Sequence, residues 1–232
     1  MDHYLILGLL GGLLALDDRT GWQSLLSQPI FTASIVGYLF GELSIGLSIG
    51  LFLELIWLAI LPMRGTRRPD QVCGTITGAA SACYVIQGGG DPRFAFIIAL
   101  GVFIGLISGE LSARISFPLM GLRERRLGRV VQMSGDSQWQ PATSLVWVHA
   151  FAMAYIFVVE VILVLVFLFV GGIISTWISS YAGSLVTRAF EQWGLLLPAF
   201  GIASLIHVYW HKHLTRFLVL SAGLILIVLW KK

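Results

Sequence analysis

Apolar runs separated by short polar segments make up most of the chain. Eight such runs can be distinguished, at residues 5–16, 30–61, 72–86, 94–107, 142–170, 171–189, 195–210 and 217–230. A transmembrane helix needs about 20 apolar residues, so several runs are too short for one crossing and residues 30–61 are too long for one. Several runs are also rich in glycine. The pattern predicts an all-α fold of about seven to nine helical segments, some of them re-entrant or broken helices like those that line transporter cavities.

The composition indicates an integral membrane protein. Of the 232 residues, 57% are apolar and 12% are charged, whereas a soluble domain averages about 25% charged residues. We therefore expect one polytopic membrane domain over residues 1–232, with no separate soluble domain. The formal net charge of +3 does not indicate nucleic-acid binding, because the basic residues cluster in short segments that set membrane orientation.

One basic segment predicts the topology. Between residues 114 and 129 there are five arginines and one acid, Glu124. The positive-inside rule places a basic loop of about residues 112–141 in the cytoplasm. Residues 64–68 form a second basic cluster, and simple alternating helices cannot put every basic cluster on one side. Either a re-entrant segment intervenes, or one cluster has a role other than topology.

Glycines recur at intervals of four, which places small residues on one helix face and lets backbones approach closely. The glycines concerned are Gly37 and Gly41, Gly46 and Gly50, and Gly101, Gly105 and Gly109. Residues 37–42 (GYLFGE) also resemble residues 105–110 (GLISGE). This match indicates a possible inverted repeat of the kind found in transporters.

Acidic residues inside apolar runs are costly in a membrane and face a cavity or a partner. Glu54 is the most isolated of them, and either accepts hydrogen bonds from substrate hydroxyls or binds the backbone end of a broken helix. Glu42 is predicted to cap a helix at a glycine-rich break. Glu160 is predicted to be structural, either protonated or paired with Arg188 or another buried group. Asp70 follows Pro69 and is predicted to be a helix N-cap.

The chain lacks the signatures of several enzyme classes. There is no G-x-x-x-x-G-K-[ST] loop, no nucleophile elbow and no spacing typical of metal ligands. Cys73 and Cys83 lie in an apolar stretch and are interpreted as buried thiols. We therefore expect no catalytic residue, no metal and no cofactor in this chain. Energy for transport must come from a gradient or from another polypeptide.

A series of ordered residues resembles the membrane component IIC of the mannose/fructose/sorbose family of bacterial phosphotransferase systems. The series comprises GLLGGLLALDD at 8–18, Gln23, Ser27-Gln28-Pro29, Val36-Gly37, Gly41-Glu42, Gly46, Gly50, Leu53-Glu54-Leu55, Pro69-Asp70 and Trp147-Val148-His149. The resemblance is strongest over about residues 5–80 and returns at residues 147–154.

The resemblance implies a sugar-translocating subunit of the bacterial inner membrane. It implies a second membrane subunit, component IID, and soluble components IIA and IIB that carry phosphate from phosphoenolpyruvate. Component IIC itself is not phosphorylated, and the family forms trimers of IIC–IID pairs with re-entrant hairpins. Gln23, Glu54 and Asp70 become the main candidates for sugar contact, because carboxylates and amides bind sugar hydroxyls. His149 joins them, although a lone histidine is more often structural.

The chain departs from the family pattern in front of Asp70. Small neutral residues are usual there, but this chain has Arg64, Arg67 and Arg68. These arginines would suit an acidic substrate or pair with Glu54 and Asp70, or they mark a chain that keeps the fold without transport. Two alternatives to sugar translocation therefore stay open. One is a regulatory or binding membrane protein, and the other is a proton-driven secondary transporter.

Overall fold

The computed structural model describes residues 2–20, 24–58, 68–89, 93–134, 142–181 and 184–208. Within these ranges the chain forms helices and no strands, which confirms the predicted all-α fold. The helices are α1 (Asp2–Thr20), α2 (Pro29–Phe40), α3 (Leu43–Trp57), α4 (Gln71–Gln87), α5 (Phe94–Ser134), α6 (Ala142–Tyr181) and α7 (Ser184–Val208). The apolar run at 217–230 lies outside the described residues.

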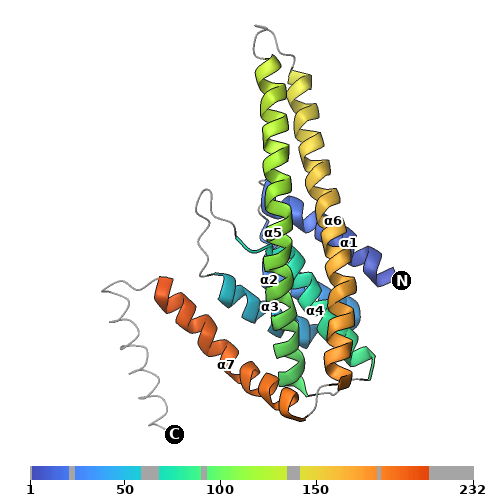
Figure 1. The fold of residues 1–232 in the computed structure, drawn as a ribbon, viewed down its shortest axis with the longest axis vertical. Coiled ribbons are helices and arrows are strands. Elements are labelled where there is room, and N and C mark those ends of the chain that lie inside the picture. The colour runs from blue at the N-terminus through green and yellow to red at the C-terminus, as the bar shows by residue number, and fades with distance from the viewer. Residues whose placement is uncertain are drawn as a thin grey trace.

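Two long helices, α5 and α6, dominate the shape of the molecule (Figure 1). They have 41 and 40 residues, which corresponds to about 60 Å each, roughly twice the hydrocarbon thickness of a bilayer. Phe94–Gly121 and Val146–Tyr181 are long and apolar enough to cross a membrane. Because α5 continues to Ser134, the prediction of a loop over residues 112–141 was wrong for 112–134, which are helical. Residues 135–141 lie outside the described part.

Helices α2 and α3 form a short hairpin at the predicted glycine-rich break. With 12 and 15 residues, they are about 18 and 22 Å long, too short to cross the hydrocarbon core alone. Gly41 makes the turn in the left-handed region, with φ of 77°, and Glu42 N donates to Gly37 O at 2.8 Å. The broken helix is thus confirmed. Gly41 serves the turn, whereas Gly37 packs against Gly46 of α3.

Helix α4 is the central element and packs against α2, α5 and α6. It runs antiparallel to α5, with Gly74 opposite Gly105 and Gly78 opposite Gly101. The predicted close approach through glycines on α5 is therefore confirmed. The expected repeat is not supported locally, because residues 105–109 continue inside α5 whereas residues 37–41 end α2.

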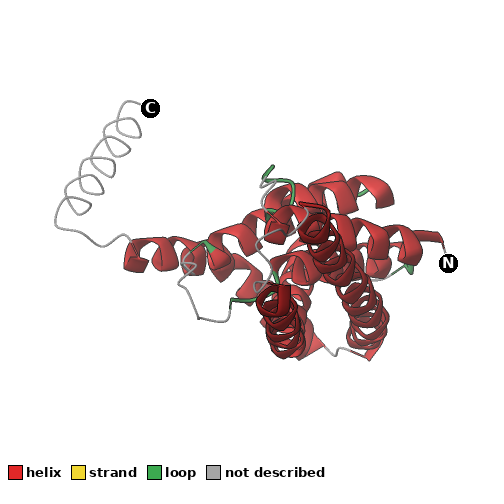
Figure 2. Ribbon diagram, turned by 90° about the horizontal axis from the view of Figure 1, so that it is seen from above, coloured by secondary structure: helices red, strands yellow, loops and turns green. Residues whose placement is uncertain are grey.

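Helix α7 packs along α5 and α3 and reaches out to one side of the bundle (Figure 2). Aromatic rings make its main contact with α5. Phe190 meets Phe96 and Phe103 edge-on, and Trp193 meets Phe103 in the same way. Consequently α7 lies away from the junction of α1, α4 and α6.

Candidate functional site

A polar cavity of about 240 Å³ lies where the end of α1 and the start of α4 meet the middle of α5. We call it the Asp70 cavity. Its lining residues are Asp18, Arg19, Arg68, Pro69, Asp70, Ala113, Ser116, Phe117 and Met120. Four of these nine carry charge, so the cavity offers both hydrogen-bond donors and acceptors.

Asp70 is held in a fixed orientation at the wall of this cavity. Its Oδ1 accepts a hydrogen bond from Cys73 N at 3.2 Å, which confirms the predicted N-cap of α4. Its Oδ2 accepts from Ser112 Oγ at 2.7 Å and from Arg19 Nη2 at 3.0 Å. The backbone N–H of Asp70 also donates to Gly109 O at 2.9 Å. Helices α1, α4 and α5 thus all fix this one carboxylate.

Behind the cavity, Glu160 of α6 is fully buried and pairs with Arg19. Arg19 Nη1 lies 3.2 Å from Glu160 Oε2, and the Asp70 carboxyl group is a second interacting neighbour of Glu160. The sequence named Arg188 or another buried group as the partner of a paired Glu160, and in the structure that partner is Arg19. The reason is the packing, because α1 lies along α6 whereas Arg188 is exposed on α7.

A second ion pair at the cavity neutralises Arg68. Its Nη2 donates to both oxygens of Asp18, at 3.0 and 2.8 Å. The sequence suggested Glu54 or Asp70 as partners of the arginines before Pro69. For Arg68 that suggestion was wrong, because the end of α1 brings Asp18 to it. Arg64 and Arg67 lie outside the described residues.

Asp17, next to Asp18, organises the segment between α1 and α2. Its carboxylate accepts hydrogen bonds from Ser24 N and Ser24 Oγ, both at 2.7 Å, and from Ser27 N at 3.1 Å. These three bonds hold residues 24–27 against the end of α1. Gln23 immediately precedes this segment but lies outside the described residues, so its predicted sugar contact stays a prediction.

Glu54 lies outside the lining of the Asp70 cavity. Its Oε2 accepts a hydrogen bond from Ile30 N at 3.3 Å, at the first turn of α2. This contact matches the second interpretation of Glu54, a carboxyl bound to the backbone end of a broken helix. Sugar binding by Glu54 stays a prediction. Glu42 occupies the N-cap position of α3 as predicted, but its side chain makes no capping hydrogen bond.

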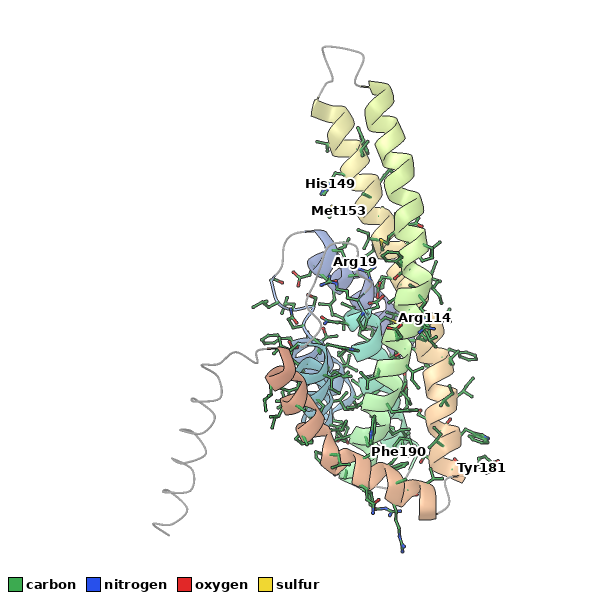
Figure 3. All side chains as sticks on the ribbon, turned by 60° about the vertical axis from the view of Figure 1, so that its left-hand side comes forward. Arg19, Arg114, His149, Met153, Tyr181 and Phe190 are labelled. Atoms are coloured by element: carbon green, nitrogen blue, oxygen red, sulfur yellow. The ribbon has the colours of Figure 1, made fainter. Side chains whose placement is uncertain are left out.

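His149 is exposed on α6 and lies nearer the free end of the α5–α6 pair than Arg19 does (Figure 3). It precedes Glu160 by eleven residues, or about 17 Å along the helix. The structure therefore does not bring His149 to the Asp70 cavity, and its role in sugar binding stays a prediction.

Sequence reasoning missed Arg19 and Ser112 as parts of this site. A signal for Arg19 was present, because it directly follows two acids at the end of an apolar helix. No signal pointed to Ser112, which is one of several small polar residues on α5. Its importance depends on the register between α4 and α5.

Comparison with known proteins identifies the family. The model of the family described as "PTS system sorbose-specific iic component" matches residues 3–230. A putative N-acetylgalactosamine permease IIC component 2 of Escherichia coli (strain K12) is 29% identical over 103 residues, which cover 44% of this chain and 74% of that protein.

Two solved structures share the fold at 16% sequence identity. One, described as "Structure of membrane protein", has a TM-score of 0.62, and the other, the mannose transporter ManYZ in complex with microcin E492, has a TM-score of 0.51. Each comparison covers 98% of this chain and 92% of the other. Because the model of the family described as "PTS system sorbose-specific iic component" spans nearly the whole sequence, the chain belongs to this family of IIC components, the sugar-specific membrane permease subunits of phosphotransferase systems.

Proposed function

We propose that this chain binds a neutral sugar at the Asp70 cavity and moves it inward for phosphorylation by a partner IIB chain. It works as a multi-pass protein of the bacterial inner membrane, paired with component IID and served by the soluble IIA and IIB components. The IIC–IID pairs assemble as trimers. The chain supplies the sugar site, and it receives no phosphate itself.

The orientation of Asp70 is the observation that carries this proposal. Three hydrogen bonds to its carboxylate hold it at the cavity wall, so its position is set before any ligand arrives. Pre-organised carboxylates bind ligands without the entropic cost of ordering a side chain. Sugar hydroxyls both donate and accept hydrogen bonds, and the cavity presents acids and arginines side by side.

The balance of charge at the cavity favours a neutral ligand. Asp18 and Asp70 each face an arginine within 3.0 Å, so the lining contributes two acids and two cations. The cavity is slightly smaller than the roughly 300 Å³ at which ligand pockets begin. A monosaccharide is therefore a better fit than a longer oligosaccharide.

The test is phosphoenolpyruvate-dependent phosphorylation of labelled sugars by membranes that contain this chain, its IID partner and the soluble components. The panel includes hexoses, N-acetylhexosamines and hexuronates. Asp70→Asn keeps an oxygen for Cys73 N but removes the charge, and we expect it to lower the phosphorylation rate at least tenfold. Glu191→Gln is the matched control, because Glu191 pairs with Arg93 at the surface, far from the cavity in the sequence.

Each alternative has its own outcome in this assay. Equal rates for Asp70→Asn and the control would rule out the Asp70 cavity as the sugar site. An assembled complex that phosphorylates no sugar would favour a regulatory protein. Uptake that ignores phosphoenolpyruvate and collapses with the proton gradient would favour a secondary transporter.

A further inference from the structure

A second hollow lies at the opposite end of α4 from Asp70. Two adjoining cavities, of about 250 and 310 Å³, share Tyr84 and Thr176 in their linings, and we call them together the Tyr84 cavity. Tyr84 follows Asp70 by fourteen residues, which is about 21 Å along the helix. The other wall comes from the last turns of α6, near Tyr181, at the end opposite to His149 (Figure 3).

Hydroxyl groups dominate the polar lining of this cavity. Tyr84 contributes from α4, Tyr4 from α1, and Thr176, Ser179 and Ser180 from α6. The residues that line it include no acid, base or histidine, in contrast to the Asp70 cavity. Phe169 and Ile173 add an apolar wall. A ligand that matches this surface carries several hydroxyl groups, no charge and one apolar face, which is the chemistry of a neutral sugar.

The Tyr84 hydroxyl of α4 is buried and interacts with the Tyr4 hydroxyl of α1, which belongs to the same lining. Each phenolic oxygen can both donate and accept, so one contact between the two leaves hydrogen-bonding capacity for a bound hydroxyl group. Thr176 Oγ1 donates to Gly172 O at 2.8 Å, which leaves its lone pairs available as acceptors.

Further buried hydroxyls continue from Tyr84 along α4 toward Asp70. Ser81 and Thr77 precede Tyr84 by three and seven residues, so all three share one helix face. Both side chains are fully buried, and Thr77 interacts with Cys73 one turn earlier on α4. Gly171 of α6 packs against the side chains of Ser81 and Thr77. It therefore covers this face of α4 between the Tyr84 cavity and the Asp70 cavity. The Asp70 cavity and the Tyr84 cavity are thus separate sites, joined by a row of buried hydroxyl groups on α4.

We propose that the Tyr84 cavity is a second sugar-binding site, which takes the neutral sugar at the outer face before it reaches Asp70. This inference rests on the proposed function for the direction of transport. The arginine-rich part of α5 follows residue 114 and so extends past the Asp70 end of the bundle. The positive-inside rule then places the Tyr84 end toward the outside. Sugar arriving from outside meets these hydroxyls first.

The site is tested by equilibrium binding to the purified IIC–IID complex in phosphatidylcholine nanodiscs, with tritiated mannose and tritiated N-acetylgalactosamine as probes. The Asp70→Asn background removes the charged site. In that background we expect one remaining sugar site per IIC chain. We expect Tyr84→Phe to lower the sugar affinity of this site at least tenfold. Tyr38→Phe is the matched control, because Tyr38 is exposed on α2.

Two results would overturn the proposal. One is that neither probe binds to the Asp70→Asn complex. The other is equal affinity after Tyr84→Phe and Tyr38→Phe. Because this assay measures sugar binding without phosphorylation, failure of the second site can be distinguished from failure of the proposed function. A complex that phosphorylates sugar but shows no effect of Tyr84→Phe keeps that function and loses the second site.

A labelling experiment separates a sugar from a lipid headgroup, which also carries hydroxyls. With Cys73 and Cys83 replaced by serine, Ser180→Cys is treated in intact cells with a membrane-impermeant thiol reagent. We expect labelling from outside, slowed severalfold by the sugar that binds. Labelling from the cytoplasmic side alone would contradict the assignment. Slower labelling in phosphatidylglycerol nanodiscs, with no slowing by either sugar, would also contradict it, because the occupant would then be a lipid headgroup.

Discussion

Arg19 Nη2 lies 3.0 Å from Asp70 Oδ2, so the last turn of α1 is tied to the N-cap of α4. The same guanidinium lies 3.2 Å from Glu160 of α6. One cation therefore faces two buried acids and joins three helices. Buried charges are costly unless they are paired, so this arrangement makes the three positions depend on one another.

We expect Arg19→Gln to be strongly destabilising, because it leaves Asp70 and Glu160 buried without a cation. Breaking a buried ion pair from one side costs about 3–5 kcal/mol. The measurement is thermal unfolding of the purified complex. Arg114→Gln is the control, since its pair with Glu110 is exposed and such pairs are worth about 1 kcal/mol or less. Similar unfolding temperatures for the two variants would show that the ion pairs of Arg19 do not stabilise the fold.

Replacing the Glu160 carboxyl group by a neutral amide should restore part of that stability. In the Arg19→Gln/Glu160→Gln double variant one of the two unpaired acids is neutral, so we expect it to be more stable than Arg19→Gln alone. A double-mutant cycle on unfolding free energies measures this coupling. Additive effects of the two substitutions would mean that the contact between Arg19 and Glu160 is not energetically significant.

Substitutions at Glu54 separate its two interpretations. Glu54→Leu removes the acceptor for Ile30 N, and we expect a loss of about 1 kcal/mol in unfolding free energy. Glu54→Gln keeps an acceptor oxygen and should unfold like the parent. If Glu54 also contacts sugar, as the sequence predicts, Glu54→Gln raises the KM for phosphorylation without that loss of stability. An unchanged KM would contradict sugar contact by Glu54 and leave only its hydrogen bond to the start of α2.

The contact between α4 and α5 predicts a sharp difference between two glycines of α5. A Cβ at Gly109 would lie 2.9 Å from Asp70 O and 3.2 Å from Trp57 Cζ2, whereas nothing lies within 4 Å of a Cβ at Gly121. We expect Gly109→Ala to cost about 1–3 kcal/mol and to lower sugar phosphorylation, because Asp70 must move. Gly121→Ala should be neutral or stabilising by up to about 1 kcal/mol. Unfolding and activity of the two variants are compared directly, and equal behaviour would contradict the packing.

The pairing of Arg68 with Asp18 predicts which sugars compete for the site. In the parent protein we expect neutral hexoses or N-acetylhexosamines to inhibit phosphorylation of the labelled substrate and hexuronates to have little effect. Asp18→Asn leaves Arg68 without its acid, so inhibition by hexuronates should strengthen on the order of tenfold, or about 1.4 kcal/mol. Strong inhibition of the parent by hexuronates would show that the cavity is built for an acidic substrate.

The sequence by itself determined the fold class, because long continuous apolar runs in a chain with 12% charged residues are typical of membrane helices, whose backbone groups are all hydrogen-bonded within the segment. It also located the break between α2 and α3, since Gly41 supplies the positive φ that the turn needs. Asp70 was identified as a helix cap for a similar local reason, the proline before it. Each of these features depends on a few neighbouring residues.

Only the tertiary structure decided which charges meet. Arg19 and Glu160 are 141 positions apart, and they pair because α1 packs along α6. Arg68 pairs with Asp18 instead of Glu54 or Asp70, because the end of α1 lies beside the start of α4. The length of α5 past residue 112 was also decided at this level, since arginines suit a long helix as well as a loop. Charge partners depend on helix register and packing, and a one-dimensional pattern of apolar and polar residues does not contain either.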